Sequence, residues 1–366
     1  MANILMIMDG MQDIAYDVLD GKTPYDYGKG KYFTAIETAS KKLLLATTPA
    51  GFEPDTKDCT LTLLGVQADE IPRGRSYLEA LAEGVDVGDN DIIMRCNFVE
   101  IDEQRRVKVP CCNAPQPVAE ELLAAVRAAG SFLKPVGTYK SLQVIKGART
   151  SFADMVTYPP HNHSGEALEE ILPHGNLLAD SLAEMSRVLL EKHFPYTVFN
   201  WGQAVKEEVP LFTKLHGISG AMVTKTAALE GIARAMQMEC PVIPTATGDT
   251  DTDLGAKARA TLELARRHDF VLMHVGGTDE ATHRQNPKEK ADFIAKIDKE
   301  LLGPILEGCA EGDRILLTCD HAALCSTSSH TSEPVLTMLW QKGTVLAGDM
   351  GLQDGTQAIS ILMNEK

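Results

Sequence analysis

The chain has 366 residues, of which 44% are hydrophobic and 23% are charged, as in an ordinary water-soluble globular protein. Its net charge of −16 argues against nucleic acid and anionic membrane as partners. No apolar run approaches the roughly 18 residues of a membrane-spanning helix, and the N-terminus lacks the basic region of a signal peptide. With eight cysteines and no CxxC pair, the sequence indicates a cytoplasmic protein with reduced thiols. Nothing in it predicts an oligomeric state.

Strand-like and helix-like segments alternate along the chain. The expected strands are 3–8, 241–244, 270–275 and 315–319. The expected helices are 59–65, 77–84, 117–129, 166–193 with a break near Pro173 and Gly175, 226–237, 253–267 and 287–307. This alternation predicts an α/β fold with a mostly parallel sheet and helices on both of its faces.

Aspartates and histidines follow three of the expected strands. The six residues are Asp9 after the first strand, Asp279 and His283 after 270–275, Asp320 and His321 after 315–319, and then His330. Ligands of open α/β sheets bind outside the carboxyl ends of the strands, so these side chains are expected to meet in a two-metal site. Mixed carboxylate and imidazole ligands favour Mn²⁺ or Zn²⁺, with Mg²⁺ as the third option. Any one of these residues alone is more often a helix cap or a surface polar group.

The positions of these residues also predict the domain organisation. A chain of this length exceeds what one hydrophobic core usually fills. One expected ligand lies near the N-terminus and the others lie after residue 270. We therefore expect a discontinuous metal-binding phosphotransferase domain of residues 1–90 and 205–366, with a smaller α/β cap domain, residues 91–204, inserted into it.

A series of short motifs spans nearly the whole chain. They are Met8-Asp9-Gly10, Leu63-Leu64-Gly65, Leu78-Glu79-Ala80-Leu81, Arg95-Cys96-Asn97-Phe98, Pro159-Pro160-His161, Trp201-Gly202-Gln203, Gly231-Ile232-Ala233, Ala246-Thr247-Gly248, Asp279-Glu280-Ala281 with His283, Asp320-His321, and Ser329–Pro334. Each is weak alone, but their order and spacing together are specific. On these motifs the chain resembles the archaeal-type cofactor-independent phosphoglycerate mutases of the alkaline phosphatase superfamily.

The resemblance implies an alkaline-phosphatase-like fold and two divalent metal ions, with no organic cofactor. One ion would be held by Asp279, His283 and His330. The other would be held by Asp9, Asp320, His321 and the nucleophile. Asp279 and His283 are four residues apart, so one helical turn could also place them on one face.

The expected nucleophile departs from the family pattern. Counting back from Gly65 places Thr56 where the family usually carries a serine. A metal-bound threonine hydroxyl has a lowered pKa and can attack phosphorus. Thr56 could instead be the N-cap of the following helix, and both roles could hold at once. Thr60 is the fallback nucleophile if the turn is shifted, and Ser76 is a distant third.

The substrate groups match the family only in part. Arg75 and Arg95 match arginines that would grip phosphate or carboxylate, although each could be a surface salt bridge. His161 and His163 are candidate proton donors, or turn histidines without chemistry. Three positions differ from the family: Lys140-Ser141 stands where the family has Arg-His or Arg-Asn, Asn162 follows His161 where the family has aspartate, and Glu230 precedes Gly231 where the family often has lysine.

The first expected function is transfer of a phosphoryl group through a phosphothreonine on a small phosphorylated acid, from 3-phosphoglycerate to 2-phosphoglycerate. The second is a phosphotransferase or phosphohydrolase for another phosphate or phosphonate substrate, a homoserine-kinase-like activity included. The threonine and the three altered positions favour the second. The third is a non-catalytic metal-binding protein.

Overall fold

The computed structural model describes residues 1–129 and 131–364, and the chain forms two compact units. The first comprises Met1–Ile71 and Val209–Lys366, and the second is Pro72–Glu208. The second unit starts before the expected boundary at residue 91, because α4 (Arg75–Ala82) packs within it. Tyr77 of this helix shares an apolar cluster with Ile93 and Leu142.

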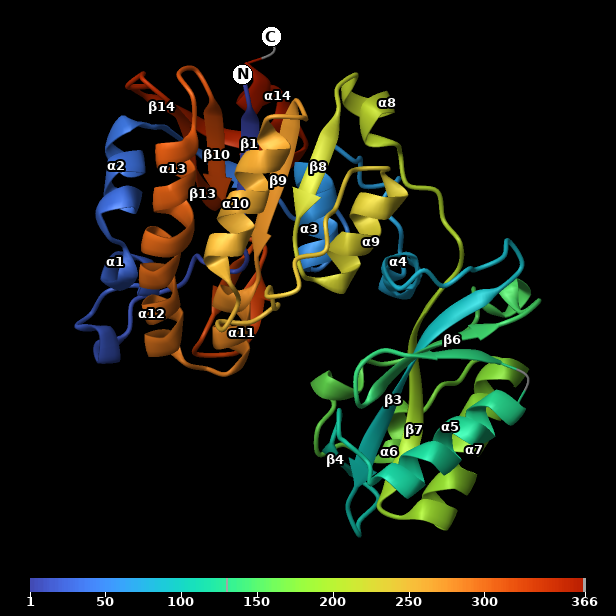
Figure 1. Ribbon diagram of the computed structural model, residues 1–366. Coiled ribbons are helices and arrows are strands. Elements are labelled where there is room, and N and C mark those ends of the chain that lie inside the picture. Colours follow the sequence, from blue (N-terminus) through green and yellow to red (C-terminus); the bar gives the residue numbers. More distant parts are fainter. Residues whose placement is uncertain (130, 365–366) are drawn as a thin grey trace. The chain divides into compact units, whose positions relative to one another are not determined.

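A seven-stranded sheet forms the centre of the first unit (Figure 1). Its strand order is β14 (Asp349–Asp354), β2 (Lys41–Ala46), β13 (Val335–Gln341), β10 (Arg314–Thr318), β1 (Asn3–Met8), β9 (Phe270–Val275) and β8 (Gly220–Val223). β1 pairs in parallel with β10 and β9, and β8 pairs in parallel with β9, whereas β13 is antiparallel to both neighbours. Every residue of β1 and β9 is buried, which explains their continuous apolar sequences. The expected mostly parallel sheet is confirmed.

Helices cover both faces of this sheet. They are α1 (Pro24–Gly28), α2 (Lys31–Ala39), α3 (Thr56–Leu63), α8 (Phe212–His216), α9 (Ala227–Ala235), α10 (Leu254–Ala265), α11 (Gly277–His283), α12 (Pro287–Ile297), α13 (Gly303–Gly308) and α14 (Ala358–Met363). In Figure 1, α10 and α13 lie on one side of the strands, and α3 and α14 lie on the other. The central strands are therefore shielded from water on both faces.

One strand expected in this unit is wrong. Residues 241–244 form no strand, and 220–223 form β8 at that edge of the sheet instead. Pro241 and Pro244 have no N–H to donate to a ladder, which explains the failure. Just before this segment, Glu239 forms an isolated bridge with Ala221 of β8.

The second unit is an antiparallel sheet with helices. β3 (Ile92–Ile101) pairs with three strands, β4 (Val107–Val109), β6 (Lys140–Ile145) and β7 (Tyr196–Ala204), and β5 (Phe132–Pro135) pairs with β6. The helices are α4, α5 (Gln116–Ala128), α6 (Leu168–Ile171) and α7 (Leu177–His193). The break expected near Pro173 and Gly175 is the gap between α6 and α7. An apolar cluster containing Phe98, Leu122 and Leu189 joins α5 and α7 to the sheet.

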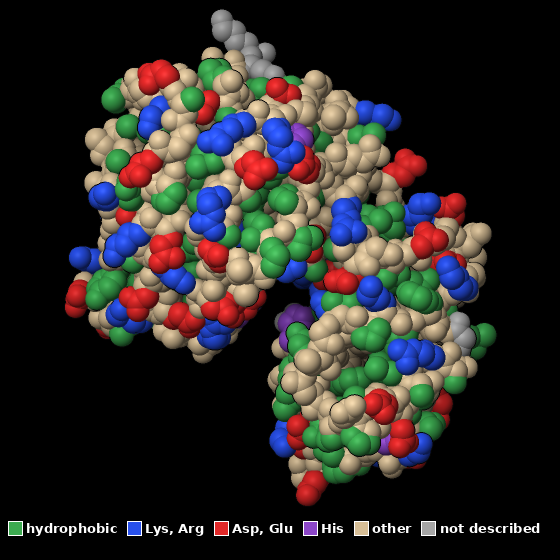
Figure 2. All heavy atoms as spheres, in the orientation of Figure 1, with side chains coloured by type: hydrophobic (Ala, Val, Ile, Leu, Met, Phe, Trp, Pro, Cys, Tyr) green, Lys and Arg blue, Asp and Glu red, His purple; other side chains and the backbone are tan. Residues whose placement is uncertain are grey.

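The surface agrees with the ordinary charge content of the sequence. On the visible face of each unit, acidic and basic side chains are interspersed (Figure 2). Among the helices within the described residues, none is both long and apolar enough to cross a membrane.

Candidate metal centre

The carboxyl ends of two adjacent parallel strands supply the first group of candidate ligands. Asp9 directly follows β1, and its N–H donates to the Val275 carbonyl at the end of β9 (3.0 Å). Asp320 and His321 come just after the neighbouring β10. All three side chains are buried, and one ligand atom from each lies within 4.8 Å of the others.

The atoms of this first group are arranged for a cation. His321 Nε2 lies 3.7 Å from Asp9 Oδ1 and 3.5 Å from Asp320 Oδ2. Both of these buried oxygens accept no hydrogen bond from any described residue. The other oxygen of Asp320, Oδ1, accepts from the N–H groups of Gly10 (3.1 Å) and His321 (3.0 Å). A buried carboxylate oxygen without a donor is costly, and a divalent ion would satisfy both oxygens at once.

The second group comes from a helix and a hairpin. Asp279 and His283 lie one turn apart on α11, and His283 Nε2 is 3.0 Å from Asp279 Oδ2. His330 lies on β12 (Ser329–Thr331), which pairs with β11 (Ala322–Leu324), and its Nε2 is 3.1 Å from Asp279 Oδ1. His330 Nδ1 donates to the Pro54 carbonyl (3.1 Å), so Nε2 is left as a metal-binding nitrogen.

The two groups adjoin each other. The rings of His321 and His330 are stacked, with centroids 3.8 Å apart. Gly10 lies between the groups with φ of +59°, and a Cβ there would come within 2.9 Å of Asp279 Oδ1. The close approach and the left-handed backbone together require glycine after Asp9.

The titration behaviour of these groups reflects their crowding. Burial raises the pKa of Asp9 well above its usual value, and the nearby Asp320 and Asp279 carboxylates raise it further. Burial alone would lower the pKa of His330, but the hydrogen bond and charge of Asp279, the hydrogen bond to Pro54 and the charge of Asp320 together outweigh it and raise the pKa to about 9. Protons and divalent cations therefore compete for this region.

Thr56 lies beside the first group. Its hydroxyl Oγ1 donates to Asp9 Oδ2 (3.4 Å) and is 3.5 Å from His321 Nε2. The interpretation of Thr56 as the N-cap is wrong, because Asp55 caps α3 by accepting from the Lys57 N–H (2.9 Å). Thr56 is the first residue inside the helix, so its hydroxyl is not committed to capping.

The fallback nucleophiles lie elsewhere. Thr60 is one helical turn after Thr56, and its buried hydroxyl has no hydrogen-bond partner among the described residues. Ser76 belongs to the second unit, where its hydroxyl donates to the Gly202 carbonyl. Ser76 is therefore engaged in a structural contact within that unit.

The expected substrate arginines form one cluster in the second unit. The buried carboxylate of Glu79 accepts from Arg95 Nε (2.8 Å), and Arg75 Nε lies 3.2 Å from it. Lys140 Nζ is 3.8 Å away. Burial would raise the pKa of Glu79, but Arg95 and then Arg75 lower it to about 2. Three cationic side chains therefore surround one buried carboxylate in this unit.

An aromatic side chain supports this cluster. The Arg95 guanidinium lies over the Trp201 ring, 4.5 Å from its centroid, and His161 contacts the same ring edge-to-face at 5.3 Å. Arg95 is only 8% exposed, so it is not a surface salt bridge. His163 Nδ1 is instead 3.0 Å from Glu166.

The three positions that differ from the family have different surroundings. Ser141 is buried within β6. Glu230 lies in the first turn of α9 and its carboxylate is 3.2 Å from Lys225 Nζ. The side chain of Asn162 lies outside the described part of the structure.

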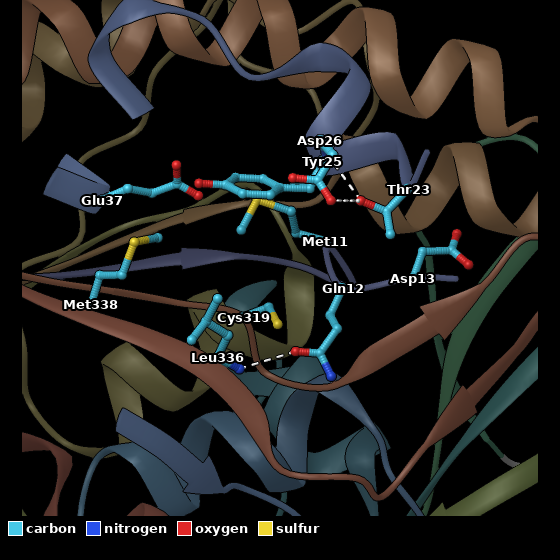
Figure 3. Close-up of a pocket in the computed structure, with 10 residues that line it drawn as sticks. All are labelled: Met11, Gln12, Asp13, Thr23, Tyr25, Asp26, Glu37, Cys319, Leu336 and Met338. Carbon is cyan, nitrogen blue, oxygen red and sulfur yellow. Dashed lines mark hydrogen bonds between the residues drawn. The ribbon is translucent and has the colours of Figure 1, made fainter. Parts of the chain in front are cut away.

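A separate cavity of about 220 Å³ lies beside the loop that follows β1 (Figure 3). Apolar and polar side chains both line it, and none of the expected site residues is among them. Its carboxylates are paired within the protein, since Asp13 bonds to the buried Lys290 (3.0 Å) and Glu37 bonds to Lys29 (3.2 Å). The cavity is therefore distinct from the candidate metal centre.

Sequence reasoning missed two residues. His274, inside β9, has its Nε2 3.1 Å from Asp9 Oδ2, and burial lowers its pKa to about 4. Its only signal was a histidine inside an otherwise apolar strand. Glu79 was visible only as part of a motif, although its spacing of four residues from Arg75 is that of a helical ion pair.

Comparisons with known proteins cover the full chain. The family model described as the metalloenzyme superfamily matches residues 1–359. A 2,3-bisphosphoglycerate-independent phosphoglycerate mutase 2 from Methanothermobacter thermautotrophicus is 29% identical, over 100% of this chain and 98% of that protein. A probable mutase of the same description from Geobacter sulfurreducens is 29% identical, over 94% and 92%.

Two solved structures share the fold. The PH0037 protein from Pyrococcus horikoshii has a TM-score of 0.75 at 24% identity, covering 99% of this chain and 96% of that chain. The cofactor-independent phosphoglycerate mutase from Thermoplasma acidophilum has a TM-score of 0.58 at 19% identity, covering 100% and 99%. Both likenesses extend over the two units.

The first prediction concerns the metal ligands. Asp320→Asn keeps the oxygen that accepts the two N–H groups but replaces the facing oxygen with an amide. We expect one of two divalent ions to be lost. The metal affinity of that site should fall by more than the roughly 10- to 100-fold typical when a residue that hydrogen-bonds to a metal ligand is removed. Metal analysis and titration calorimetry measure this effect. Asp298→Asn is the matched control, because this buried aspartate also accepts two backbone N–H groups, those of Tyr32 and Phe33 in α2. Two ions bound with unchanged affinity in Asp320→Asn would contradict the assignment.

The second prediction concerns Glu79. Its pKa is depressed in the folded state, so its stabilisation is present above about pH 4.5 and is lost as the pH falls toward 2. The stability difference between the Glu79 protein and Glu79→Gln should shrink by about 2 kcal/mol between pH 7 and pH 3.

Urea unfolding followed by Trp201 fluorescence measures this difference in a Trp340→Phe background, which leaves one of the two tryptophans. Glu103→Gln, at an exposed glutamate of the same unit, is the control. The prediction is contradicted if the stability difference between the Glu79 protein and Glu79→Gln does not change with pH.

Proposed function

This chain belongs to the metalloenzyme superfamily, and we propose that it is a phosphoglycerate-mutase-like enzyme that moves a phosphoryl group on a small phosphorylated acid through Thr56. Relatives named as mutases match it nearly end to end. One observation carries the proposal: the Thr56 hydroxyl lies 3.4 Å from Asp9 within a group of buried, unsatisfied carboxylate oxygens.

The residues of the first unit suit attack on phosphorus. Asp9 Oδ2 accepts a hydrogen bond from the Thr56 hydroxyl. This bond holds Thr56 Oγ1 at the start of α3, where the helix dipole favours negative charge. When bound, divalent ions at the two groups would lower the pKa of this hydroxyl and neutralise the phosphoryl oxygens. Thr56 Oγ releases its proton to water and attacks phosphorus, the P–O bond to the substrate breaks, the leaving oxygen takes up a proton from the general acid, and a phosphothreonine results.

The second half of the reaction returns the phosphoryl group. In a mutase, the other hydroxyl of the bound acid attacks the phosphothreonine and frees Thr56. We assign Arg75 and Arg95 to bind the anionic groups of the acid, since guanidinium groups bind carboxylate and phosphate in a bidentate manner. His161 is the candidate general acid for the leaving oxygen.

A second function is favoured by one position. Glu230 stands where the resemblance expects a lysine, and its carboxylate pairs with Lys225. A glutamate cannot bind the anionic substrate group that a lysine at this position would bind. A phosphotransferase or phosphohydrolase for a different phosphate or phosphonate ester keeps the Thr56 chemistry and changes only the organic partner.

The third prediction tests this function. A coupled assay follows conversion of 3-phosphoglycerate to 2-phosphoglycerate with Mn²⁺ and, separately, Zn²⁺. Thr56→Ala should lower kcat by a factor of at least about 10³, because the nucleophile is removed. Thr56→Ser should remain active, and Thr60→Ala serves as the matched control. Mass spectrometry of acid-quenched enzyme should show one added phosphoryl group on Thr56.

Each other outcome has a definite meaning. Full activity in Thr56→Ala would refute the nucleophile. No turnover in an unmodified protein that binds both ions would exclude the mutase and move the assay to other phosphate and phosphonate esters. No phosphothreonine with any of them would support the non-catalytic metal-binding alternative.

A further inference from the structure

We propose that Thr224 and His274 form a hydrogen-bonded relay that fixes the orientation of Asp9, and that His274 is a positioning residue of the metal centre. The relay crosses the carboxyl edge of three consecutive parallel strands. Thr224 follows β8, His274 lies in β9, and Asp9 follows β1. All three side chains are buried, with exposed fractions of 2%, 0% and 4%.

The strand register places the members of the relay side by side. His274 is opposite Ile7 of β1, and Met273 is opposite Val223 of β8. The relay therefore depends on the sheet itself rather than on a mobile loop. A site built on strands holds its side chains more precisely than a site built on loops.

The hydrogen bonds determine which nitrogen of His274 carries the proton. Thr224 Oγ1 accepts from the Thr226 N–H (3.2 Å) and lies 3.3 Å from His274 Nδ1. His274 Nε2 lies 3.1 Å from Asp9 Oδ2. If Nδ1 carried the only ring proton, the lone pair of Nε2 would face a carboxylate oxygen in a buried site. The proton therefore lies on Nε2 and is donated to Asp9, and the Thr224 hydroxyl donates to Nδ1.

This donation selects which oxygen of Asp9 faces the candidate metal position. Oδ2 is engaged by His274, whereas Oδ1 has no donor among the described residues and lies 3.7 Å from His321 Nε2. The Thr278 hydroxyl also donates to the Asp9 carbonyl, so the backbone of the ligand is held as well. Outer hydrogen bonds of this kind orient metal-binding carboxylates.

The chemistry of imidazole suits this role. A neutral ring orients the carboxylate without placing a cation against it, so the charge of Asp9 remains available for a metal ion. A lysine at this position would neutralise Asp9 and compete with the ion. The relay thus offers a physical reason for a histidine inside a buried strand.

The fourth prediction tests the relay through metal binding, without any substrate. Thr224→Val removes the hydroxyl that holds Nδ1, and His274→Leu removes the donor to Asp9. Each should weaken Mn²⁺ binding at one of the two sites by about 10- to 100-fold in titration calorimetry. The affinity of the other site should change little, because it is built from Asp279, His283 and His330.

Conservative variants separate positioning from folding. Thr224→Ser keeps the hydroxyl and His274→Gln keeps an N–H donor, so both should retain wild-type Mn²⁺ affinity within a few-fold. Thr261→Val is the matched control, because Thr261 is equally buried and its hydroxyl donates to the Lys257 carbonyl within α10. Thermal unfolding of every variant checks that the fold is intact.

A second measurement reads the relay directly. Nitrogen-15 NMR of the histidine side chains in the full chain should show His274 as the Nε2–H tautomer, and Thr224→Val should shift that equilibrium. Unchanged Mn²⁺ affinity in both Thr224→Val and His274→Leu would overturn the proposal, as would a proton on Nδ1. The NMR result stands even if the chain is not a mutase, so failure of the relay and failure of the proposed function are distinguishable.

Discussion

Asp9, Asp279 and Asp320 place three carboxylates in one buried region at the carboxyl edge of a parallel sheet. Their mutual repulsion and their burial both oppose ionisation, as the raised pKa of Asp9 indicates. Uncharged donors hold two of the three carboxylates: the Gly10 and His321 N–H groups donate to Asp320, and the His274 ring donates to Asp9. On each of these two aspartates, one oxygen is held by the protein and the other is left without a donor.

The different roles of the two oxygens on each aspartate depend on the order of the strands in the sheet. β1 lies between β9 and β10, so residues far apart in the sequence reach one edge with fixed spacing. Gly10 permits the chain to turn beside Asp279, where a Cβ would collide with the carboxylate. The first turn of α3 then places Thr56 against Asp9, because Asp55 takes the capping role and leaves the Thr56 hydroxyl available.

Much of this arrangement could be predicted from the sequence. A buried parallel strand is a continuous apolar run, so β1, β9 and β10 were visible, and so were the aspartates that follow them. The i, i+4 spacing of Asp279 and His283 revealed a helical turn. β8 was missed, because four residues of apolar sequence at a sheet edge carry no distinct signal. His274 was missed because its partners, Thr224 and Asp9, are far away in the sequence.

The cluster around Glu79 shows the same limit. Its helical pair with Arg75 could be recognised by spacing, but Arg95 and Lys140 reach it only because β3 and β6 pair beside α4. Capping also depends on backbone geometry: Asp55 and Thr56 are both good caps, and only the dihedral angles distinguish the residue outside the helix from the first one inside it. Long-range pairing and local backbone conformation are the two things that a motif cannot supply.

The charges of the chain determine the order in which metal ions and substrate bind in the proposed reaction. With a net charge of −16 and three carboxylates at the reacting centre, the first unit alone would repel a phosphate ester. Two divalent ions at the two ligand groups would reverse the sign of that local field. In the proposed reaction, ion binding must therefore precede productive binding of the phosphoryl group at Thr56.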